Sequence, residues 1–562
     1  MGKKRVIIGM AVGLVVISAL VFGILILTRN VGKTERTVDA ENAKTQLADM
    51  VRRIDPSTAT PKKSSVEYSE KDTTAEELPA LDTNAVTCEE TTASFAEIWS
   101  SPEKAGQGTD GWMREMAEAF NASGAQVDGQ KVSIRLRTMS SGLGVDYIST
   151  GKEHPAGFSP SNMLLIDLLA GKGIKCDVIR ERMVGNVAGI LLDEEHYNSL
   201  MDKYGTVDLK AITEAVGTGN LTMGYTNPFT SSTGFNFLVS TLLRYDRDNP
   251  LSGTAADGFR QFQANVPFVA LTTVQMRDAA ERGSLDGFVL EWQLYQNDPS
   301  LSSNYTFVPF GYRHDNPLVA CPTASDTERK ILELFAQYCD DNGKDLANRY
   351  GFNGKEDYVS ELPEITGETL VAAQDLYKKN KDTGRPVIAV FVADVSGSMN
   401  GAPLAELQNS LINSMRYINT DNFVGMASYS DYVTIELPVD QFNLNQQALF
   451  KGAVENLTAG GGTATHDGII VAAKMVEDAL AEHPDAKPMI FVLSDGETNA
   501  DIISFEDMKA VIGGLRIPVY TIGYNANISA LQNISNINEA ASIDASTDDV
   551  TYQLRNLFNA NM

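Results

Sequence analysis

A continuous apolar run, Val387 to Ala393, ends directly in the segment Asp394-Val395-Ser396-Gly397-Ser398 and constrains the fold more than any other stretch of the chain. An apolar run of this kind is typical of a central strand in a parallel sheet, because such a strand is buried on both faces. Strand and helix patterns then alternate, with strands expected at 423–428, 489–493 and 518–524 and helices at about 403–418, 466–480 and 551–559. This alternation predicts an open, doubly wound, Rossmann-like sheet that binds ligands at the carboxyl ends of its strands.

Three short segments lie where loops of this sheet are expected. DVSGSM follows the first apolar strand, GGT precedes a helix, and SDGE follows another apolar strand. They resemble the three pieces of the metal-ion-dependent adhesion site of von Willebrand factor type A-like domains, and the resemblance covers about residues 385–562. It implies a divalent cation, either Mg²⁺ or else Mn²⁺ or Ca²⁺, held by five residues: Asp394, Ser396, Ser398, Thr463 and Asp495.

These five residue types suit a hard dication, because Mg²⁺ takes oxygen ligands in an octahedron and keeps some of its waters. The hydroxyls of Ser396, Ser398 and Thr463 can ligate directly. Asp394 and Asp495 supply charge, partly through water. By the resemblance, one metal position stays open for a carboxylate of a protein partner, so the site is expected to bind and not to catalyse. The alternative, that DxSxS only caps the helix after it, is disfavoured because three separate loops agree.

A different α/β pattern occupies residues 94–365. Strands alternate with helices there, as in the strand expected at 95–99, the helix at 110–121 and the strand at 132–136, which argues for α/β layers. Several segments resemble the extracytoplasmic solute-binding proteins of bacterial ABC-type importers: Trp99-Ser100-Ser101, GFSPS (157–161), TNPFTSSTG (226–234), LDGFVLEW (285–292) and HDNPLVA (314–320). The resemblance implies a two-lobed, periplasmic-binding-protein-like module around a cleft.

Hydroxyl side chains gather at three turns that follow expected strands and precede helices. Free backbone N–H groups and the positive end of the helix dipole meet at helix starts, so these turns can cradle an oxyanion or a carboxylate. The alternative is ordinary N-capping, which Ser and Thr perform in many helices. A small anionic solute is therefore the expected ligand, and the candidate residues are Ser100, Ser101, Ser140, Ser141, Thr230, Ser231, Ser232 and Thr233.

The N-terminal segment predicts a membrane anchor. Val6 to Leu27 contains no charged residue, and its 22 residues would span roughly 33 Å as a helix, enough to cross a bilayer. A cleavable signal peptide has a shorter apolar region, so an uncleaved transmembrane helix is expected within residues 1–30. Residues 31–93 are polar, with a Thr-, Ser-, Glu- and Pro-rich second half, and are expected to form a stalk. Residues 366–384 are expected to link the two modules.

The composition narrows the range of functions. Lys plus Arg number 46 and Asp plus Glu 73, a formal charge of −27 that repels phosphate backbones and argues against a nucleic-acid partner. The chain has no GxSxG, HExxH or Walker motif, so no enzymatic activity is expected.

The four cysteines, Cys88, Cys176, Cys321 and Cys339, form no CxxC pair. Either two disulfides outside the cell or four buried thiols are compatible with them.

Together these features predict a single-pass bacterial surface protein of the cell membrane. Both resembled families work outside the inner membrane when anchored in this way, so we expect a cytoplasmic N-terminus and extracytoplasmic domains. The expected function is adhesion-type binding of a protein through the metal, with an accessory solute cleft. The alternative is a receptor that delivers an anionic solute to an ABC-type importer. An assembly factor would require a cytoplasmic location and fits the anchor poorly.

Overall fold

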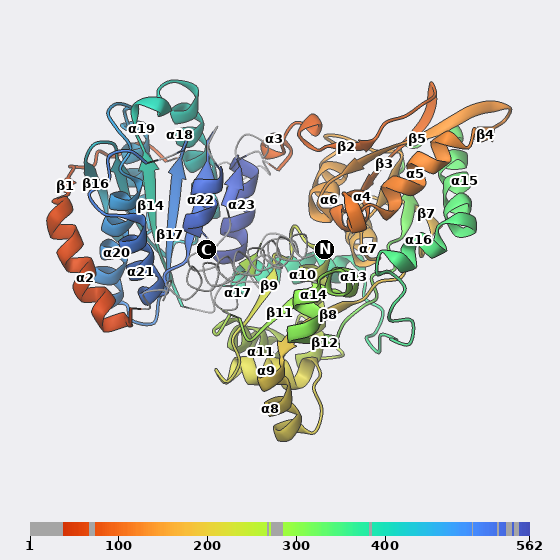
Figure 1. Ribbon diagram of the computed structural model, residues 1–562, viewed down its shortest axis with the longest axis horizontal. Coiled ribbons are helices and arrows are strands. Elements are labelled where there is room, and N and C mark those ends of the chain that lie inside the picture. Colours follow the sequence, from red (N-terminus) through yellow and green to blue (C-terminus); the bar gives the residue numbers. More distant parts are fainter. Residues whose placement is uncertain are drawn as a thin grey trace, which may run out of the picture.

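The computed structural model describes residues 38–66, 74–266, 269–270, 285–381, 385–496, 498–524, 528–535, 542–544 and 550–562. This part of the chain forms three α/β bodies: a C-terminal domain and the two lobes of a central module (Figure 1). The expected transmembrane segment, Val6 to Leu27, lies outside the described residues. Of the helices that are described, none combines the length and the apolar character needed to cross a membrane.

The C-terminal domain is built on a seven-stranded sheet in the order β1-β16-β15-β14-β17-β18-β19. Its central strand, β14 (Val387–Asp394), is buried along its whole length and runs parallel to both of its neighbours. β16 is antiparallel to β15. The other strands contributed by this domain are β15 (Phe423–Tyr429), β16 (Val433–Gln441), β17 (Lys487–Ser494), β18 (Val519–Gly523) and β19 (Ser542–Asp544).

Successive side chains of β14 enter two different cores, because a strand presents alternate residues to its two faces. Phe391 packs in the core covered by α18 (Ala402–Ser414), α19 (Leu444–Glu455) and α23 (Val550–Asn561). Val390 and Val392 pack in the core covered by α20 (Thr465–Glu482), α21 (Phe505–Leu515) and α22 (Ile528–Ser535). The helix-covered, mainly parallel sheet that the sequence predicts is therefore present.

The N-terminal end of the expected stalk is part of the C-terminal domain. α2 (Ala40–Ile54) packs on α20 and α21 through Ala43, Leu47, Met50 and Ile54, which are buried. β1 (Ser57–Thr58) then pairs with β16 as the edge strand of the seven-stranded sheet. The prediction of a stalk was wrong here: the apolar residues of α2 are few, but their spacing of three and four places all of them on one helical face.

The central module has two lobes, as predicted. The sheet of lobe 1 has the order β2-β5-β3-β6-β13-β7, and that of lobe 2 the order β10-β9-β11-β8-β12. The strands of lobe 1 are β2 (Val86–Cys88), β3 (Ser94–Ser100), β5 (Gln130–Thr138), β6 (Gly157–Ser159), β7 (Asp177–Arg180) and β13 (Leu318–Ala320), with β4 (Gln126–Val127) paired to β5. Those of lobe 2 are β8 (Ala188–Asp193), β9 (Met223–Thr226), β10 (Val269–Ala270), β11 (Gly287–Glu291) and β12 (Tyr305–Pro309).

Short helices fill the connections of both lobes. Lobe 1 carries α3 (Thr74–Glu77), α4 (Pro102–Ala105), α5 (Trp112–Ala122), α6 (Ser141–Thr150), α7 (Leu164–Gly171), α15 (Asp326–Asn342) and α16 (Lys344–Arg349). Lobe 2 carries α8 (Glu194–Tyr204), α9 (Leu209–Gly217), α10 (Ser232–Tyr245), α11 (Gly253–Gln263), α13 (Trp292–Asn297) and α14 (Pro299–Asn304).

The chain passes between the lobes twice, through residues 181–187 and 310–317. After the first passage it enters lobe 2 as β8, which is antiparallel to β11 and β12. After the second it returns to lobe 1 as β13, which is antiparallel to β6 and β7. The two passages are joined by a backbone hydrogen bond of 3.0 Å from His314 N to Asn186 O. The two passages therefore lie side by side where the lobes join.

The expected linker, residues 366–384, contains a packed helix. α17 (Gly367–Asn380) lies on α7, where a Cβ at Gly171 would come within 2.2 Å of Gly367 O, so the close approach of the two helices requires glycine. α17 leads to the C-terminal domain, whose last helix, α23, touches both lobes. The Tyr552 hydroxyl donates to Asp146 of lobe 1 (3.0 Å), and Asn227 of lobe 2 donates to Asn556 O (3.0 Å).

Replacing Leu47 by Ala tests whether α2 belongs to the C-terminal domain. Leu47 is 1% exposed, so its truncation should lower the free energy of unfolding by about 2–5 kcal/mol. Thr45→Ala, on the exposed face of the same helix, is the matched control and should leave stability nearly unchanged. Chemical denaturation measures both. An unchanged midpoint for Leu47→Ala would contradict the packing of α2.

Candidate functional site

Asp394, the last residue of β14, is the most deeply placed of the five predicted metal ligands. Its side chain is fully buried. One carboxylate oxygen accepts hydrogen bonds from the Ser494 hydroxyl (2.7 Å) and the Tyr429 hydroxyl (3.2 Å), and the other accepts from the Ser396 backbone N–H (2.8 Å). These donors come from the ends of the neighbouring strands β17 and β15 and from the loop after β14. The carboxylate is thus held in a fixed orientation at the carboxyl edge of the sheet.

The hydroxyls of the DxSxS loop face the third loop. Ser396 Oγ and Ser398 Oγ lie 3.0 Å apart, and the Ser398 hydroxyl donates to Asp495 Oδ1 at 3.0 Å. Two carboxylates and two hydroxyls therefore gather at the ends of β14 and β17. All are oxygen donors, and this donor set fits a hard dication such as Mg²⁺.

Backbone contacts bring the second loop, with Thr463, to the first. Gly460 N donates to Val395 O (2.8 Å), and Gly397 N donates to Gly461 O (3.0 Å). Gly461 adopts a φ of +88°, a conformation that L side chains rarely adopt, and this bend brings the loop back toward DxSxS. Thr463 itself is buried, and its N–H donates to Asn499 Oδ1 (2.9 Å). All three predicted loops therefore meet at one place.

Burial raises the pKa of the Asp394 carboxyl above its usual value, and the nearby Asp495 acts in the same direction. Hydrogen bonds from Ser396 and Ser494 oppose the shift. A buried carboxylate is costly unless a charge of opposite sign balances it. A dication beside the two carboxylates would supply that charge, so the electrostatics of the site fit the predicted metal.

A further set of polar residues fixes the loops and was not found from the sequence. The Asp467 carboxylate accepts from the N–H groups of Ile502 and Ile503, both at 2.9 Å. Asp501 accepts from His466 N (2.8 Å) and pairs with the His466 ring (2.7 Å). These contacts tie the start of α20 to the segment that follows Asp495. His466 lies at the start of that helix, as predicted.

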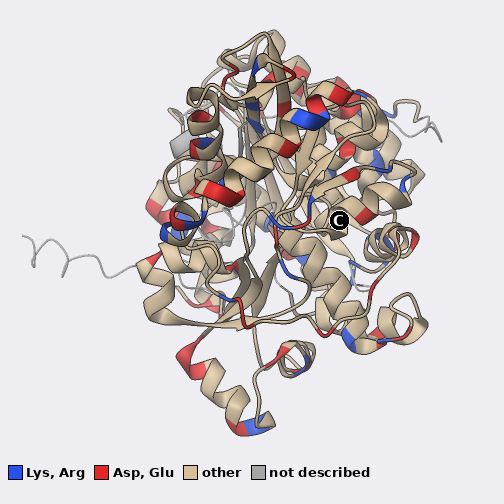
Figure 2. Cartoon of the chain, turned by 90° about the vertical axis from the view of Figure 1, so that its right-hand side faces the viewer, with Lys and Arg blue, Asp and Glu red and all other residues tan. Residues whose placement is uncertain are grey.

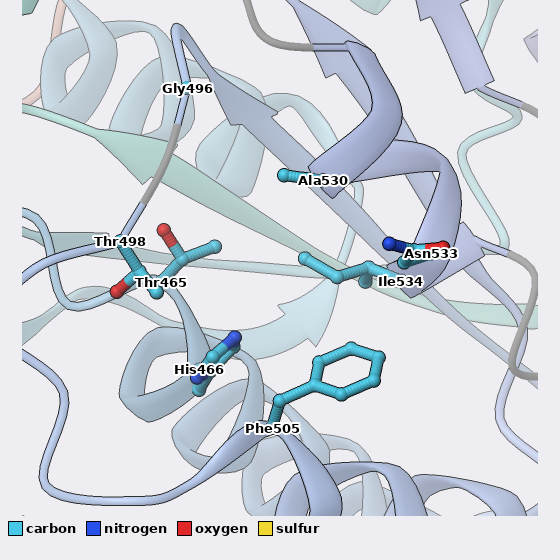
Figure 3. Close-up of a pocket in the computed structure, with 8 residues that line it drawn as sticks. All are labelled: Thr465, His466, Gly496, Thr498, Phe505, Ala530, Asn533 and Ile534. Carbon is cyan, nitrogen blue, oxygen red and sulfur yellow. The ribbon is translucent and has the colours of Figure 1, made fainter.

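A small pocket of about 160 Å³ lies beside the metal loops, between the start of α20 and helix α22 (Figure 3). Its surface is largely apolar. Gly496, one residue after Asp495, lies on its upper side in this view. The lining residues are Thr465, His466, Gly496, Thr498, Phe505, Ala530, Asn533 and Ile534.

The predicted hydroxyl residues of the cleft have different roles. Ser140 and Ser231 accept from Leu143 N (3.4 Å) and Gly234 N (3.3 Å), so the N-capping alternative applies to these two. Thr233 donates to Glu291 Oε1 (2.9 Å). The hydroxyls of Ser100 and Ser232 are buried and have no hydrogen-bond partner within the described residues.

The remaining three candidates are divided between the two lobes. Thr230 O accepts from Gly142 N (3.2 Å), a direct bond between the lobes. Ser141, also buried, begins α6. Ser101 accepts from the ammonium of Lys104 (2.8 Å), which also donates to Ser159 O (2.8 Å).

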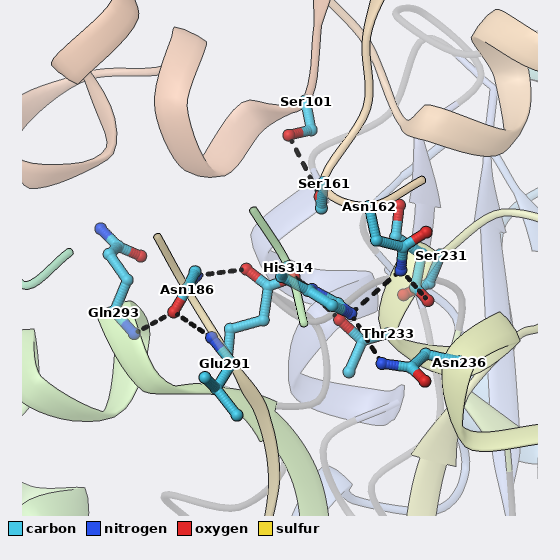
Figure 4. Close-up of polar contacts among 12 residues, drawn as sticks. Ser101, Ser161, Asn162, Asn186, Ser231, Thr233, Asn236, Glu291, Gln293 and His314 are labelled. Carbon is cyan, nitrogen blue, oxygen red and sulfur yellow. Dashed lines mark hydrogen bonds and ion pairs between the residues drawn. The ribbon is translucent and has the colours of Figure 1, made fainter. Parts of the chain in front are cut away.

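Lys104 of lobe 1 and Glu291 of lobe 2 are charged side chains outside the predicted set, and both are buried. Figure 4 shows Glu291 with the polar residues around it. Burial lowers the pKa of Lys104 to about 8, although carboxylates including Glu291 act to raise it. Glu291 pairs with the His314 ring (2.8 Å) and accepts from Asn186 Nδ2 (3.1 Å). His314 and Asn186 belong to the two passages between the lobes. The polar network around Glu291 therefore reaches both passages between the lobes.

A separate group of possible metal ligands, Asp193, His196 and Asp286, lies in lobe 2, with ligand atoms within 4.8 Å of one another. Asp193 accepts from His196 N (2.7 Å) and caps α8, and it also pairs with the His196 ring (2.8 Å). Asp286 accepts from Thr222 N (2.7 Å). Helix capping and loop pairing account for these contacts.

A family model of the von Willebrand factor type A domain matches residues 389–560. This part of the chain is a von Willebrand factor type A domain. The match includes all five predicted metal ligands and the strands β15 to β19.

Two curated relatives each match about a quarter of the chain. Inter-alpha-trypsin inhibitor heavy chain H3 of Bos taurus is 28% identical over 169 residues, which are 27% of this chain and 18% of that protein. The voltage-dependent calcium channel subunit alpha-2/delta-2 of Homo sapiens is 24% identical over 151 residues, 26% of this chain and 13% of that one. The chain thus spans less than a fifth of the length of these relatives.

Solved structures are similar to parts of the chain. A von Willebrand factor type A protein of Catenulispora acidiphila has 18% identity and a TM-score of 0.28, over 31% of this chain and 42% of that one. A periplasmic thiamin-binding protein has 12% identity and a TM-score of 0.39, over 53% and 98% of the two chains. Iron-bound HitA of Pseudomonas aeruginosa has 14% identity and a TM-score of 0.36, over 52% and 99%.

Asp394→Ala should abolish the binding of Mg²⁺ and Mn²⁺, because it removes the carboxylate around which the three loops are arranged. Isothermal titration calorimetry of the purified chain measures this loss. Asp478→Ala removes an exposed carboxylate of α20 in the same domain and should bind metal as the wild type does. An unchanged affinity in Asp394→Ala would refute the assignment. Asp394→Asn, which keeps the side-chain shape, separates loss of metal from loss of folding.

Proposed function

We propose that this protein is a membrane-anchored, extracytoplasmic binding protein whose von Willebrand factor type A domain uses a divalent metal to bind another protein. The observation that carries the proposal is the meeting of Asp394, Ser398 and Asp495 at the carboxyl edge of one sheet. Ser396 and Thr463 complete the five residues that would hold Mg²⁺, or else Mn²⁺ or Ca²⁺.

The metal would act as an electrophile for a carboxylate of the partner. The site offers two carboxylates and three neutral hydroxyls, so the negative charge that it supplies does not exceed that of the dication. Asp394 is kept in place by Ser494 and Tyr429, which donate to it from behind the site. An acidic side chain of a partner can then complete the coordination, and binding should require the metal.

The pocket beside Asp495 gives the partner a second point of contact. Because Gly496 lines the pocket, a side chain next to the bound carboxylate can reach the apolar surface of Phe505 and Ile534. The pocket holds about 160 Å³, which suits one aliphatic side chain. An acidic residue beside an aliphatic one is therefore the partner sequence that this face of the domain favours.

The second candidate is a receptor for a small solute, as in an ABC-type importer. It is favoured by the buried hydroxyls of Ser100, Ser159 and Ser232, which have no hydrogen-bond partner among the described residues. Groups of this kind are costly to bury unpaired, and a ligand in the cleft would satisfy them. The buried Lys104 beside them favours an anion, which agrees with the ligand class expected from the sequence.

The proposed location rests on the uncharged segment Val6 to Leu27. An acidic chain of net charge −27 has little attraction to nucleic acid, and Figure 2 shows acidic residues distributed over helices and loops of the chain, interspersed with basic ones. An extracytoplasmic surface also gives the metal domain access to proteins of the envelope.

A cross-linked pull-down from solubilised membranes tests the proposal. The full-length wild type and the Asp478→Ala control should capture a surface or envelope protein in the presence of Mg²⁺. Asp394→Ala, and the wild type with a chelator, should lose it, because the partner carboxylate is bound through the metal. Capture of a permease in equal amounts by the wild type and Asp394→Ala would contradict the adhesion-type function and favour the solute receptor.

A further inference from the structure

Two of the four cysteines lie opposite each other on neighbouring strands of lobe 1. Cys176 directly precedes β7, and Cys321 directly follows β13. These strands are antiparallel, with Ala320 opposite Asp177, so the register continued by one residue places Cys321 opposite Cys176. Directly opposed residues of antiparallel strands have Cα atoms about 4.5–5.5 Å apart, within the range of about 4.4–6.8 Å that a disulfide needs.

The environment of the two thiols suits a reaction between them. They are close enough to share a hydrogen bond, which lowers the pKa of Cys176 and raises that of Cys321. Arg329 lies beside them and donates to Cys321 O (3.1 Å), and its positive charge favours a thiolate. Cys176 is partly exposed, whereas Cys321 is buried. Cys176 is therefore the thiol that an oxidant can reach and that ionises more readily.

The other two cysteines have a different environment. Burial raises the pKa of Cys88 to about 11 and that of Cys339 well above its usual value. The Cys88 thiol donates to Glu89 O (3.7 Å) and accepts from Asn121 Nδ2 (3.4 Å). Because the thiolate is the reactive form, these two residues are expected to stay reduced.

We propose that Cys176 and Cys321 form a disulfide in the mature protein. The Cys176 thiolate attacks one sulfur of an external disulfide, that of a thiol oxidase or of oxidised glutathione, and releases the other sulfur as a thiolate. The Cys321 thiol then loses its proton and attacks Cys176 Sγ, which forms the internal bond and releases the second thiol. Two protein thiols are oxidised and one external disulfide is reduced to two thiols.

The bond would join the two strands through which the chain leaves lobe 1 and returns to it. β7 is the strand from which the chain leaves lobe 1, and β13 is the strand on which it returns. A bond between Cys176 and Cys321 encloses the whole of lobe 2 in one covalent loop. It covalently links β7 and β13, the lobe 1 strands that are continuous with the two passages. The bond requires an oxidising compartment, as the proposed extracytoplasmic location provides.

Thiol mapping of the full-length protein tests the proposal. Membranes are quenched in acid, and the protein is denatured, alkylated with N-ethylmaleimide without reductant, digested and examined by mass spectrometry. The expected result is a linked peptide pair containing Cys176 and Cys321, with Cys88 and Cys339 alkylated. Alkylation of all four cysteines, or a bond that includes Cys88 or Cys339, would overturn the proposal.

Matched variants distinguish the loss of the disulfide from a general loss of stability caused by replacing a cysteine. Cys88→Ser should retain the linked peptide, whereas Cys176→Ser should lose it and leave Cys321 alkylated. A reductant should lower the Tm of the wild type and of Cys88→Ser but not that of Cys176→Ser, since only the first two contain the bond. An equal response of all three to the reductant would contradict the proposal. Metal binding is measured separately, so neither result affects the metal assignment.

Discussion

The Asp394 carboxylate is removed from water at the end of β14, and its negative charge has to be balanced within the domain. Ser494, Tyr429 and the Ser396 N–H donate to it, which orients the group but adds no positive charge. Asp495 adds a second carboxylate, which accepts a hydrogen bond from the Ser398 hydroxyl. The fold thus brings like charges together at the edge of its central sheet. This arrangement is unfavourable alone and becomes favourable with a bound dication.

The von Willebrand factor type A domain and the two-lobed module contact each other directly. α2 and β1 pack on the type A domain before the chain enters the two lobes, so the two-lobed module lies between parts of one folded unit (Figure 1). α23 then contacts both lobes, through Tyr552 to Asp146 and through Asn556 to Asn227. Asn227 belongs to the turn that carries the cleft hydroxyls. A change in the angle between the lobes must therefore alter a contact of the last helix of the metal-binding domain.

The type A domain was largely predictable from sequence because a buried parallel strand is apolar throughout and its loop residues follow it directly. Asp394, Ser398 and Asp495 were identifiable for that reason, and the structure brings them together. The polar groups behind them were not, since Tyr429 reads as an ordinary strand residue and Asp467 as a helix residue. α2 was missed because only four buried side chains hold it. The pairing of Glu291 with His314 depends on the second passage of the chain between the lobes, which sequence spacing does not show.

Anomalous diffraction from crystals grown with Mn²⁺ tests the metal site most directly. A peak is predicted beside the hydroxyls of Ser396, Ser398 and Thr463, with the Ser398–Asp495 hydrogen bond replaced by contacts to the ion or its waters. A peak at Asp193, His196 and Asp286 alone, with that hydrogen bond intact, would contradict the account. So would the absence of any peak at a Mn²⁺ concentration that saturates calorimetric binding.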